Sequence, residues 1–249
     1  MAESLKAESS EVLGPVLLPD GEKRPFLEHL EELRRRALRS FLWIAAATLL
    51  TFRFSGEILQ WLIQPVGQVV FLSPAEPFLI HLKIAFLGGI GLALPLLAWE
   101  GWGFLSPALF PRQRRPVLFL VPVTVGLFAL GVWFTWAVLL PAALKFFLSF
   151  RSENLTPMVA VGSYVSFVGW FLLAGGLAFQ MPIVVMLLAK LRMICPATLL
   201  RQWRIALVGI LVAAAVLTPT PDIATQLLLA VPMCILYLIS IGLAALVAR

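Results

Sequence analysis

Several long runs of apolar residues in this sequence contain almost no charged side chain. A run of about 18 or more such residues can cross a bilayer, because about 30 Å of hydrocarbon needs about 20 residues of helix. The composition agrees, since 61% of the 249 residues are hydrophobic and 13% are charged, whereas roughly 25% of residues are charged in soluble domains. The chain is therefore predicted to be an all-α polytopic membrane protein, which excludes a soluble globular domain.

Six transmembrane helices are predicted from these runs. They cover about residues 38–63, 77–105, 116–140, 163–191, 205–217 and 224–247. Proline breaks or kinks a helix because it lacks a backbone N–H and fixes its own φ. Four prolines at or within the runs are therefore given structural roles, namely Pro65, Pro95, Pro141 and Pro182.

The fifth predicted helix, residues 205–217, is unusually short. At 1.5 Å per residue it reaches only about 20 Å, less than a typical hydrocarbon core. Such a helix must lie in locally thinned lipid or have one end covered by protein. A re-entrant pair formed by the fifth and sixth segments is the alternative.

Basic residues predict the orientation. Fifteen of the 19 Lys and Arg residues lie before the first helix or in its first turn, after the last helix, in the 2–3 loop, or in the 4–5 loop and the helix ends next to it, all on one side of the membrane. The positive-inside rule makes that side cytoplasmic and places both termini there. Residues 1–24 lack the uninterrupted apolar core of a signal peptide. They are predicted to be a disordered cytoplasmic tail, and residues 25–249 the membrane domain.

The sequence lacks the chemical motifs of enzymes and cofactor sites. It has no Walker, H-E-x-x-H or G-x-S-x-G motif. His29 and His81 are predicted on opposite sides of the membrane, and Cys195 and Cys234 are isolated, so no metal or cofactor is expected. Topology accounts for the net charge of +6. Neither an enzyme nor a nucleic-acid-binding protein is predicted.

The segment PFLEHLEELRRRALRS precedes the first predicted span and carries an apolar stripe at helical spacing. Glu31 with Arg35, and Glu32 with Arg36, are i,i+4 pairs, and such pairs stabilise a helix by only about 0.2–0.5 kcal/mol each. Two interpretations remain open. The helix lies on the lipid surface, or its carboxylates receive a basic ligand.

Three polar residues interrupt or border the later apolar runs. Glu100 lies between tryptophans that mark the membrane interface, where a structural and a functional carboxylate are equally consistent with the pattern. Gln180 precedes Pro182 and is expected to bond a carbonyl freed by that proline, a neighbouring helix, or a partner subunit. Asp222 precedes the last span, where a carboxylate caps the helix.

Six short motifs resemble, in order, those of the TatC component of the twin-arginine translocase. They are HLEELRRR, SPAEPF, FLSPALFPRQRR, SYVSFV, FQMP and TPTPDIATQ. The resemblance runs from about Pro25 to the C-terminus and implies a glove-like, concave six-helix fold with short fifth and sixth helices. It also implies a receptor in the cytoplasmic (inner) membrane for twin-arginine signal peptides of folded proteins. Single-span TatA and TatB proteins, lipid and further copies of the chain are the implied partners, and the proton-motive force is the implied driving force.

The same resemblance implies two groups of site residues. The signal peptide is expected to contact Glu32, Arg34, Glu100, Phe104, Pro107, Leu109, Gln113, Arg114 and Arg115. Partner helices are expected to contact Gln180, Asp222 and Gln226. Gln113 stands where the family usually has glutamate, and Glu100 stands near a position where it usually has glutamine. Our hypothesis is that Glu100 supplies part of the missing negative charge.

A secondary transporter or ion channel is the alternative function, with Glu100, Gln180 and Asp222 along a polar path. A membrane scaffold without a receptor role is a third interpretation. The sequence shows no inverted repeat, and these three residues are predicted at different depths rather than at one midplane site. Both observations count against the transporter or channel.

Overall fold

The computed structural model describes residues 23–105, 114–149, 158–190, 194 and 196–247. In these ranges the regular elements are helices, accompanied by one isolated bridge between Val70 and Ala160. In chain order the elements are α2 (Lys23–Ile63), α3 (Glu76–Leu105), α4 (Arg114–Phe134), the π-helical turn η3 (Thr135–Leu139), α5 (Leu140–Leu148), α6 (Val161–Ala178), α7 (Met181–Lys190), α8 (Pro196–Arg201), α9 (Trp203–Leu217) and α10 (Ile223–Val247). The predicted all-helical fold class is confirmed.

Five helical segments among the described residues are long and apolar enough to cross a membrane. They are Leu30–Ile63, Glu76–Phe104, Leu120–Leu148, Val161–Ala189 and Ile223–Ala245. Helix α9, which corresponds to the fifth predicted transmembrane helix, has 15 residues and is shorter than these five segments. A total of six membrane crossings therefore stays a prediction. Helix α10 has 25 residues, and the short sixth helix implied by the resemblance is therefore wrong. Its apolar run is continuous, and Pro232 is accommodated inside it.

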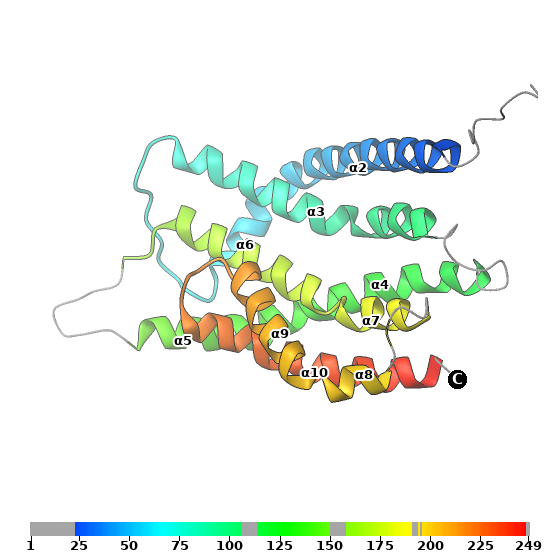
Figure 1. Ribbon diagram of the computed structural model, residues 1–249. Coiled ribbons are helices and arrows are strands. Elements are labelled where there is room, and N and C mark those ends of the chain that lie inside the picture. The colour runs from blue at the N-terminus through cyan, green and yellow to red at the C-terminus, as the bar shows by residue number, and fades with distance from the viewer. Residues whose placement is uncertain (1–22, 106–113, 150–157, 191–193, 195, 248–249) are drawn as a thin grey trace, which may run out of the picture.

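The two ends of the helical bundle are distinct. Figure 1 shows α2 and α3 side by side along one edge, with α4 and α6 next to them and α10 beyond. The described chain begins and ends at one end of the bundle, which we call the terminal end and which holds Lys23 and Val247. Loops 64–75 and 218–222 lie at the opposite, distal end. The sequence predicts that the terminal end faces the cytoplasm.

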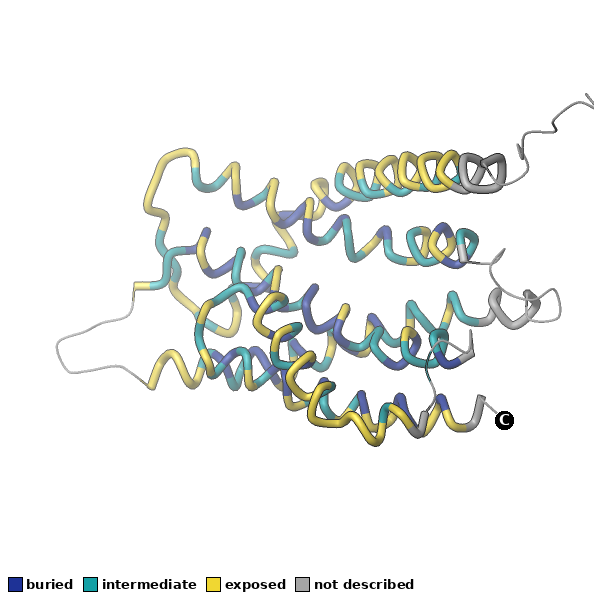
Figure 2. Tube along the Cα trace, in the orientation of Figure 1, coloured by how far each residue is buried: buried dark blue, intermediate teal, exposed yellow. Residues whose placement is uncertain are grey.

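Helix α2 continues without a break from the segment before the first predicted span into the span itself. Its 41 residues reach about 60 Å, about twice the thickness of the hydrocarbon core. A separate helix lying on the lipid surface is therefore wrong for this segment. Figure 2 shows most of the described part of α2 exposed or intermediate, as expected for a helix that neighbours cover on one side only.

Two glycines let α2 and α3 approach closely. A Cβ added at Gly89 would lie 2.7 Å from the Cα of Thr48, and one added at Gly88 would lie 2.7 Å from the Cγ2 of Thr51. Small residues at contacts between membrane helices allow the backbones to approach in this way. The close packing sets the register of the pair, and so decides which side chains of α2 face the last turns of α3.

The third segment does not end at residue 140, as the sequence predicts, but continues through η3 and α5 to Leu148. Pro141 has no N–H to donate and would normally break the ladder of helical hydrogen bonds. Here a wider π turn precedes it, closed by the N–H of Leu140 on the carbonyl of Thr135. This turn absorbs the irregularity, and the helix continues beyond the proline.

The fourth segment consists of two helices rather than the predicted continuous one. Helix α6 ends at Ala178 and α7 begins at Met181, with a turn at residues 179–180. Pro182 lies in the first turn of α7, where its missing N–H leaves no helical hydrogen bond unmade. The break therefore lies just before the proline, at Gln180.

Candidate functional site

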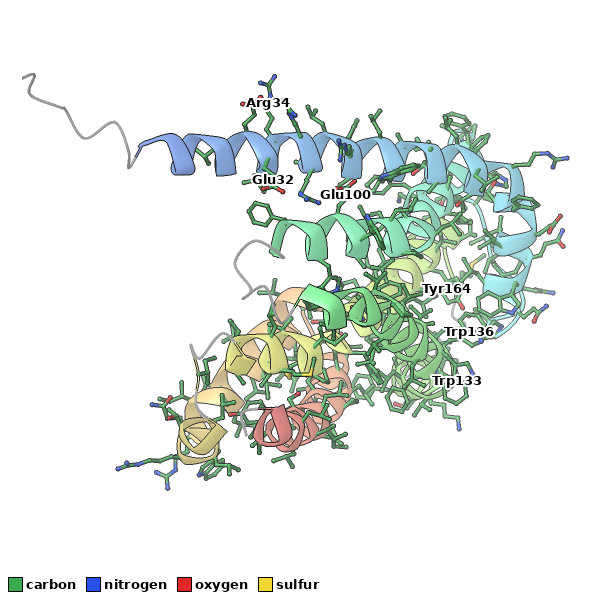
Figure 3. All side chains as sticks on the ribbon, turned by 90° about the vertical axis from the view of Figure 1, so that its right-hand side faces the viewer. Glu32, Arg34, Glu100, Trp133, Trp136 and Tyr164 are labelled. Atoms are coloured by element: carbon green, nitrogen blue, oxygen red, sulfur yellow. The ribbon has the colours of Figure 1, made fainter. Side chains whose placement is uncertain are left out.

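Carboxylates from α2 and α3 meet at the terminal end. Glu32 lies in the part of α2 before the first predicted span, and Glu100 lies in the last turns of α3. Figure 3 shows both side chains in the space between the two helices. Glu100 is buried, with 8% of its surface exposed, whereas Glu32 is half-buried. The antiparallel packing of α2 on α3 thus joins residues 68 positions apart.

Arg36 bridges the two carboxylates. Its Nε and Nη2 atoms donate to Oε1 of Glu32 over 3.0 and 2.8 Å. Its Nη1 atom lies 3.2 Å from Oε2 of Glu100 and 3.2 Å from the backbone carbonyl oxygen of the same residue. All three guanidinium nitrogens are therefore used. The sequence indicated the contact with Glu32, but the contact with Glu100 depends on how the helices pack.

The electrostatics of this cluster suit a cation. Two carboxylates surround one guanidinium, which leaves one net negative charge. The C-terminal turns of α3 add the partial negative charge of a helix C-terminus. Carboxylates accept the paired N–H donors of a guanidinium in a fork geometry that an ammonium group cannot reproduce. The cluster is therefore a candidate site for a further arginine side chain.

Arg34 does not join this cluster. It is exposed, and Figure 3 shows it on the side of α2 opposite to Glu32 and Glu100. The neighbouring pair of Arg35 with Glu31 is also outside the cluster, with a single contact of 3.2 Å and side chains 70% and 63% exposed. Of the two ion pairs on α2, Glu32 with Arg36 therefore faces α3, whereas Glu31 with Arg35 faces solvent.

The remaining predicted peptide contacts lie in the last turn of α3, in the segment between α3 and α4, and at the start of α4. Phe104 lies half-buried in the last turn of α3, next to the cluster in sequence. Pro107, Leu109 and Gln113 lie outside the described residues. Helix α4 begins with Arg114 and Arg115, of which the structure describes only the backbone. Their predicted contacts remain predictions.

Gln180 joins α4 to the break between α6 and α7. Its Nε2 atom lies 3.2 Å from the carbonyl oxygen of Thr124 and 3.4 Å from that of Gly176. The hydroxyl of Thr124 in turn accepts the indole N–H of Trp102 over 3.1 Å, which links α3 to the same place. The Oε1 atom of Gln180 is buried and has no partner among the described residues. Of the expected bonds, the one to a neighbouring helix is present, and one buried acceptor has no partner among the described residues.

Asp222 caps α10 at the distal end, as predicted. Its carboxylate accepts the backbone N–H of Thr225 over 2.8 Å and the hydroxyl of Thr225 over 2.6 Å. Desolvation acts to raise the pKa of Asp222, but hydrogen bonds from Thr220, Thr225 and backbone N–H groups outweigh it and lower this pKa. Gln226 donates to the carbonyl of Leu211 over 3.0 Å and ties α10 to α9.

Glu76, which the sequence analysis did not single out, joins three distal segments. Its carboxylate accepts the N–H of Gly162, at the start of α6, over 2.8 Å and the N–H of Leu72 over 2.5 Å. Close by, Val70 exchanges hydrogen bonds of 3.0 Å with residues 159 and 161. An acid at the first position of a helix was the available signal, but its partners are distant in sequence.

An apolar cavity of about 480 Å³ lies between α2, α3, α4 and α6, lined by apolar side chains and glycines. Trp61 and Trp136 stack at its wall with ring centroids 3.7 Å apart. Figure 3 shows Trp136, Trp133 and Tyr164 well away from Glu32 and Glu100. The cavity therefore has no carboxylate for an arginine. Among the described residues, no group of three or more potential metal ligands occurs either.

Comparison with known proteins finds relatives over most of the chain. A family model described as Sec-independent protein translocase protein (TatC) matches residues 28–232. The Sec-independent protein translocase protein TatC of Carboxydothermus hydrogenoformans is 38% identical, over 87% of this chain and 91% of that protein. The TatC protein of Aquifex aeolicus is 35% identical, over 90% and 96% respectively. A crystal structure described as the twin arginine translocase receptor TatC superposes with a TM-score of 0.80 at 35% identity, covering 89% of this chain and 100% of that one.

Proposed function

The chain belongs to the TatC family of Sec-independent protein translocase components, and from this premise we propose that it is the receptor for twin-arginine signal peptides. It is a membrane protein and a part of a translocase rather than an enzyme. The observation that carries the proposal is the pair of carboxylates, Glu32 and Glu100, gathered from two helices around a guanidinium. The family membership speaks against a transporter or channel.

The chemistry of the pair matches the ligand. Two adjacent arginines present planar donor forks, and a charge-assisted hydrogen bond contributes about 1.5–3 kcal/mol. A twin-lysine peptide carries the same charge but lacks the fork, so it binds such a site less well. Glu100, which stands near a position where the family usually has glutamine, provides the second carboxylate of the pair. This supports our hypothesis that Glu100 makes up for the neutral Gln113.

The cytoplasmic membrane is the proposed location, with the terminal end in the cytoplasm. The clustering of Lys and Arg in the tail and in the 2–3 and 4–5 loops supports this orientation. Signal peptides of unexported proteins are then on the same side as Glu32 and Glu100.

Single-span TatA and TatB proteins are the proposed partners, and further copies of the chain are proposed to join the receptor complex. Gln180 supports partner binding best, because its side chain is only partly buried and its Oε1 acceptor, although buried in this chain, has no partner among the described residues. Asp222 and Gln226 are assigned to the same role, although their described bonds are internal. A photo-crosslinker at position 180 is expected to capture a TatA or TatB helix. Capture of lipid alone would contradict the assignment.

Peptide binding tests the receptor function directly. The purified protein in lipid nanodiscs is titrated with a twin-arginine signal peptide and with the same peptide carrying two lysines. We expect clearly tighter binding of the arginine peptide, because only its guanidiniums fit the carboxylate pair. Equal affinities would contradict the proposal.

In cells, deletion of the gene is expected to stop the export of a folded twin-arginine reporter, and continued export would favour a different function.

A further inference from the structure

Arg36 already occupies the place in which the proposed function seats an arginine of the signal peptide. We propose that Arg36 is a stand-in for that arginine: it holds Glu32 and Glu100 together before the peptide binds, and the peptide displaces it. The inference rests on the proposed function and adds an internal competitor to it.

The contacts of Arg36 are those of a bound ligand. Nε and Nη2 together grip one oxygen of Glu32, and Nη1 reaches both the carboxylate and the backbone carbonyl of Glu100. A guanidinium from a peptide makes a fork-like contact with both oxygens of a carboxylate, and Arg36 already holds Oε1 of Glu32 and Oε2 of Glu100. A fork on either carboxylate therefore competes with Arg36 for the oxygen that it holds.

Gly103 leaves the room that the guanidinium fills. A Cβ added at Gly103 would overlap Nη1 of Arg36 and would lie 2.9 Å from its Cζ and 3.1 Å from its Nη2. The group it meets is the far end of a flexible side chain and not backbone. The backbone of α3 at Gly103, together with Glu32 and Glu100, therefore forms a site for one guanidinium group, which we call the guanidinium seat. Either Arg36 or an arginine of the peptide can supply that group.

The charges are balanced after displacement and not before. Two carboxylates face one guanidinium in the structure, which leaves a net charge of −1. A twin-arginine ligand brings two positive charges, which match the two carboxylates once Arg36 has left. The side chain of Arg36 is 23% exposed, and its long apolar stem allows the charged end to turn into solvent.

Arg35 is the matched control for Arg36. It is the next residue on the same helix, has the same charge, and pairs with Glu31 at the same i,i+4 spacing, but its side chain is 70% exposed and touches neither Glu32 nor Glu100. Loss of Arg35 changes the net charge of α2 by the same amount without opening the seat. A difference between the two variants therefore reports the seat alone.

The experiment measures the Kd of the twin-arginine and twin-lysine peptides for the wild type, Arg36→Gln and Arg35→Gln in nanodiscs. We expect Arg36→Gln to bind the arginine peptide about five- to tenfold more tightly than Arg35→Gln, because a competing ion pair is removed. Equal or weaker binding would overturn the inference and leave Arg36 as a residue that only positions the carboxylates.

Two further variants keep the test decisive. Gly103→Ala fills the seat, so we expect about tenfold weaker binding of the arginine peptide, and unchanged binding would overturn the inference. Arg36→Lys serves if Arg36→Gln does not accumulate in the membrane. Its ammonium group cannot fork between the carboxylates, so a gain of about threefold in affinity for the arginine peptide is expected, and no gain counts against displacement.

If the wild type does not prefer the arginine peptide to the lysine peptide, the receptor function itself fails. If it does and Arg36→Gln gains nothing, only the stand-in fails.

Discussion

The two ends of the molecule hold their acidic side chains with different partners. At the terminal end, Glu32 and Glu100 contact the guanidinium of Arg36 across two helices. At the distal end, Glu76 and Asp222 accept hydrogen bonds from backbone N–H groups, with a hydroxyl added for Asp222. All four acids are satisfied by the chain itself, but the partners differ in whether they can leave.

A guanidinium on a flexible side chain can be exchanged for another one, whereas a backbone N–H stays with its helix or loop. The distal acids therefore act as joints, and their loss is expected to affect folding. The terminal acids are held by a partner that resembles the proposed ligand, and their loss is expected to affect binding. The kind of partner, rather than the acid or its burial, separates a candidate binding site from a structural contact.

The largest effect is expected for Glu32→Gln combined with Glu100→Gln. Each substitution keeps an oxygen acceptor but removes a charge, at a cost of about 1–2 kcal/mol in binding. Together they are expected to weaken twin-arginine peptide binding about 100-fold, measured as Kd in nanodiscs. Glu100→Gln alone is expected to account for part of the loss, and an unchanged affinity in that variant would refute its role. Thermal unfolding of each variant controls for misfolding.

Glu76→Ala is expected to have the converse effect. The N–H groups of Leu72 and Gly162 lose a charged acceptor, which is expected to lower the free energy of unfolding by more than the loss of the Asp222 cap does. Peptide affinity of the folded fraction should not change. Denaturant unfolding in detergent measures the first quantity, with Glu57→Ala as control because Glu57 is an exposed acid near the same end. A loss of affinity at constant stability would remove the distinction between the ends.

Gln113→Glu tests whether the loop after α3 belongs to the terminal site. A third carboxylate facing the ligand is expected to tighten twin-arginine peptide binding about five- to tenfold, through one charge-assisted hydrogen bond. The comparison with Glu32→Ala decides the location. If Gln113→Glu has no effect and Glu32→Ala is also silent, recognition lies elsewhere in the protein.

Asp222→Ala is expected to have the smallest effect, about 1 kcal/mol of stability from a lost helix cap. Because the pKa of Asp222 is lowered in the folded protein, its contribution is present above the ordinary value of 3.8 and is lost as the pH falls through the folded value. The difference in melting temperature between wild type and variant should therefore shrink in acid. A difference that does not depend on pH would mean that the carboxylate is not the stabilising group.

The apolar runs alone were sufficient to predict the membrane class and the approximate helices. Burial of an apolar run in lipid depends on its length and not on its neighbours, so residues 77–105 and 224–247 closely match α3 and α10. The cap at Asp222 was predictable for a similar reason, since it depends on residues next to it in the chain. The π turn before Pro141 and the break at Gln180 were not, because they are local adjustments inside continuous apolar runs.

The two ion pairs of α2 show where local information ends. Glu31 with Arg35 and Glu32 with Arg36 are the same pattern, one residue apart, and spacing predicts the same weak contact for both. Both contacts occur, so the sequence was enough for them. Only the packing of α3 on one side of α2 decided that Arg36 also reaches Glu100, that Gly103 leaves room for it, and that Arg35 stays in solvent. A helix presents successive residues about 100° apart, and the neighbour that one of them meets is chosen by the tertiary fold.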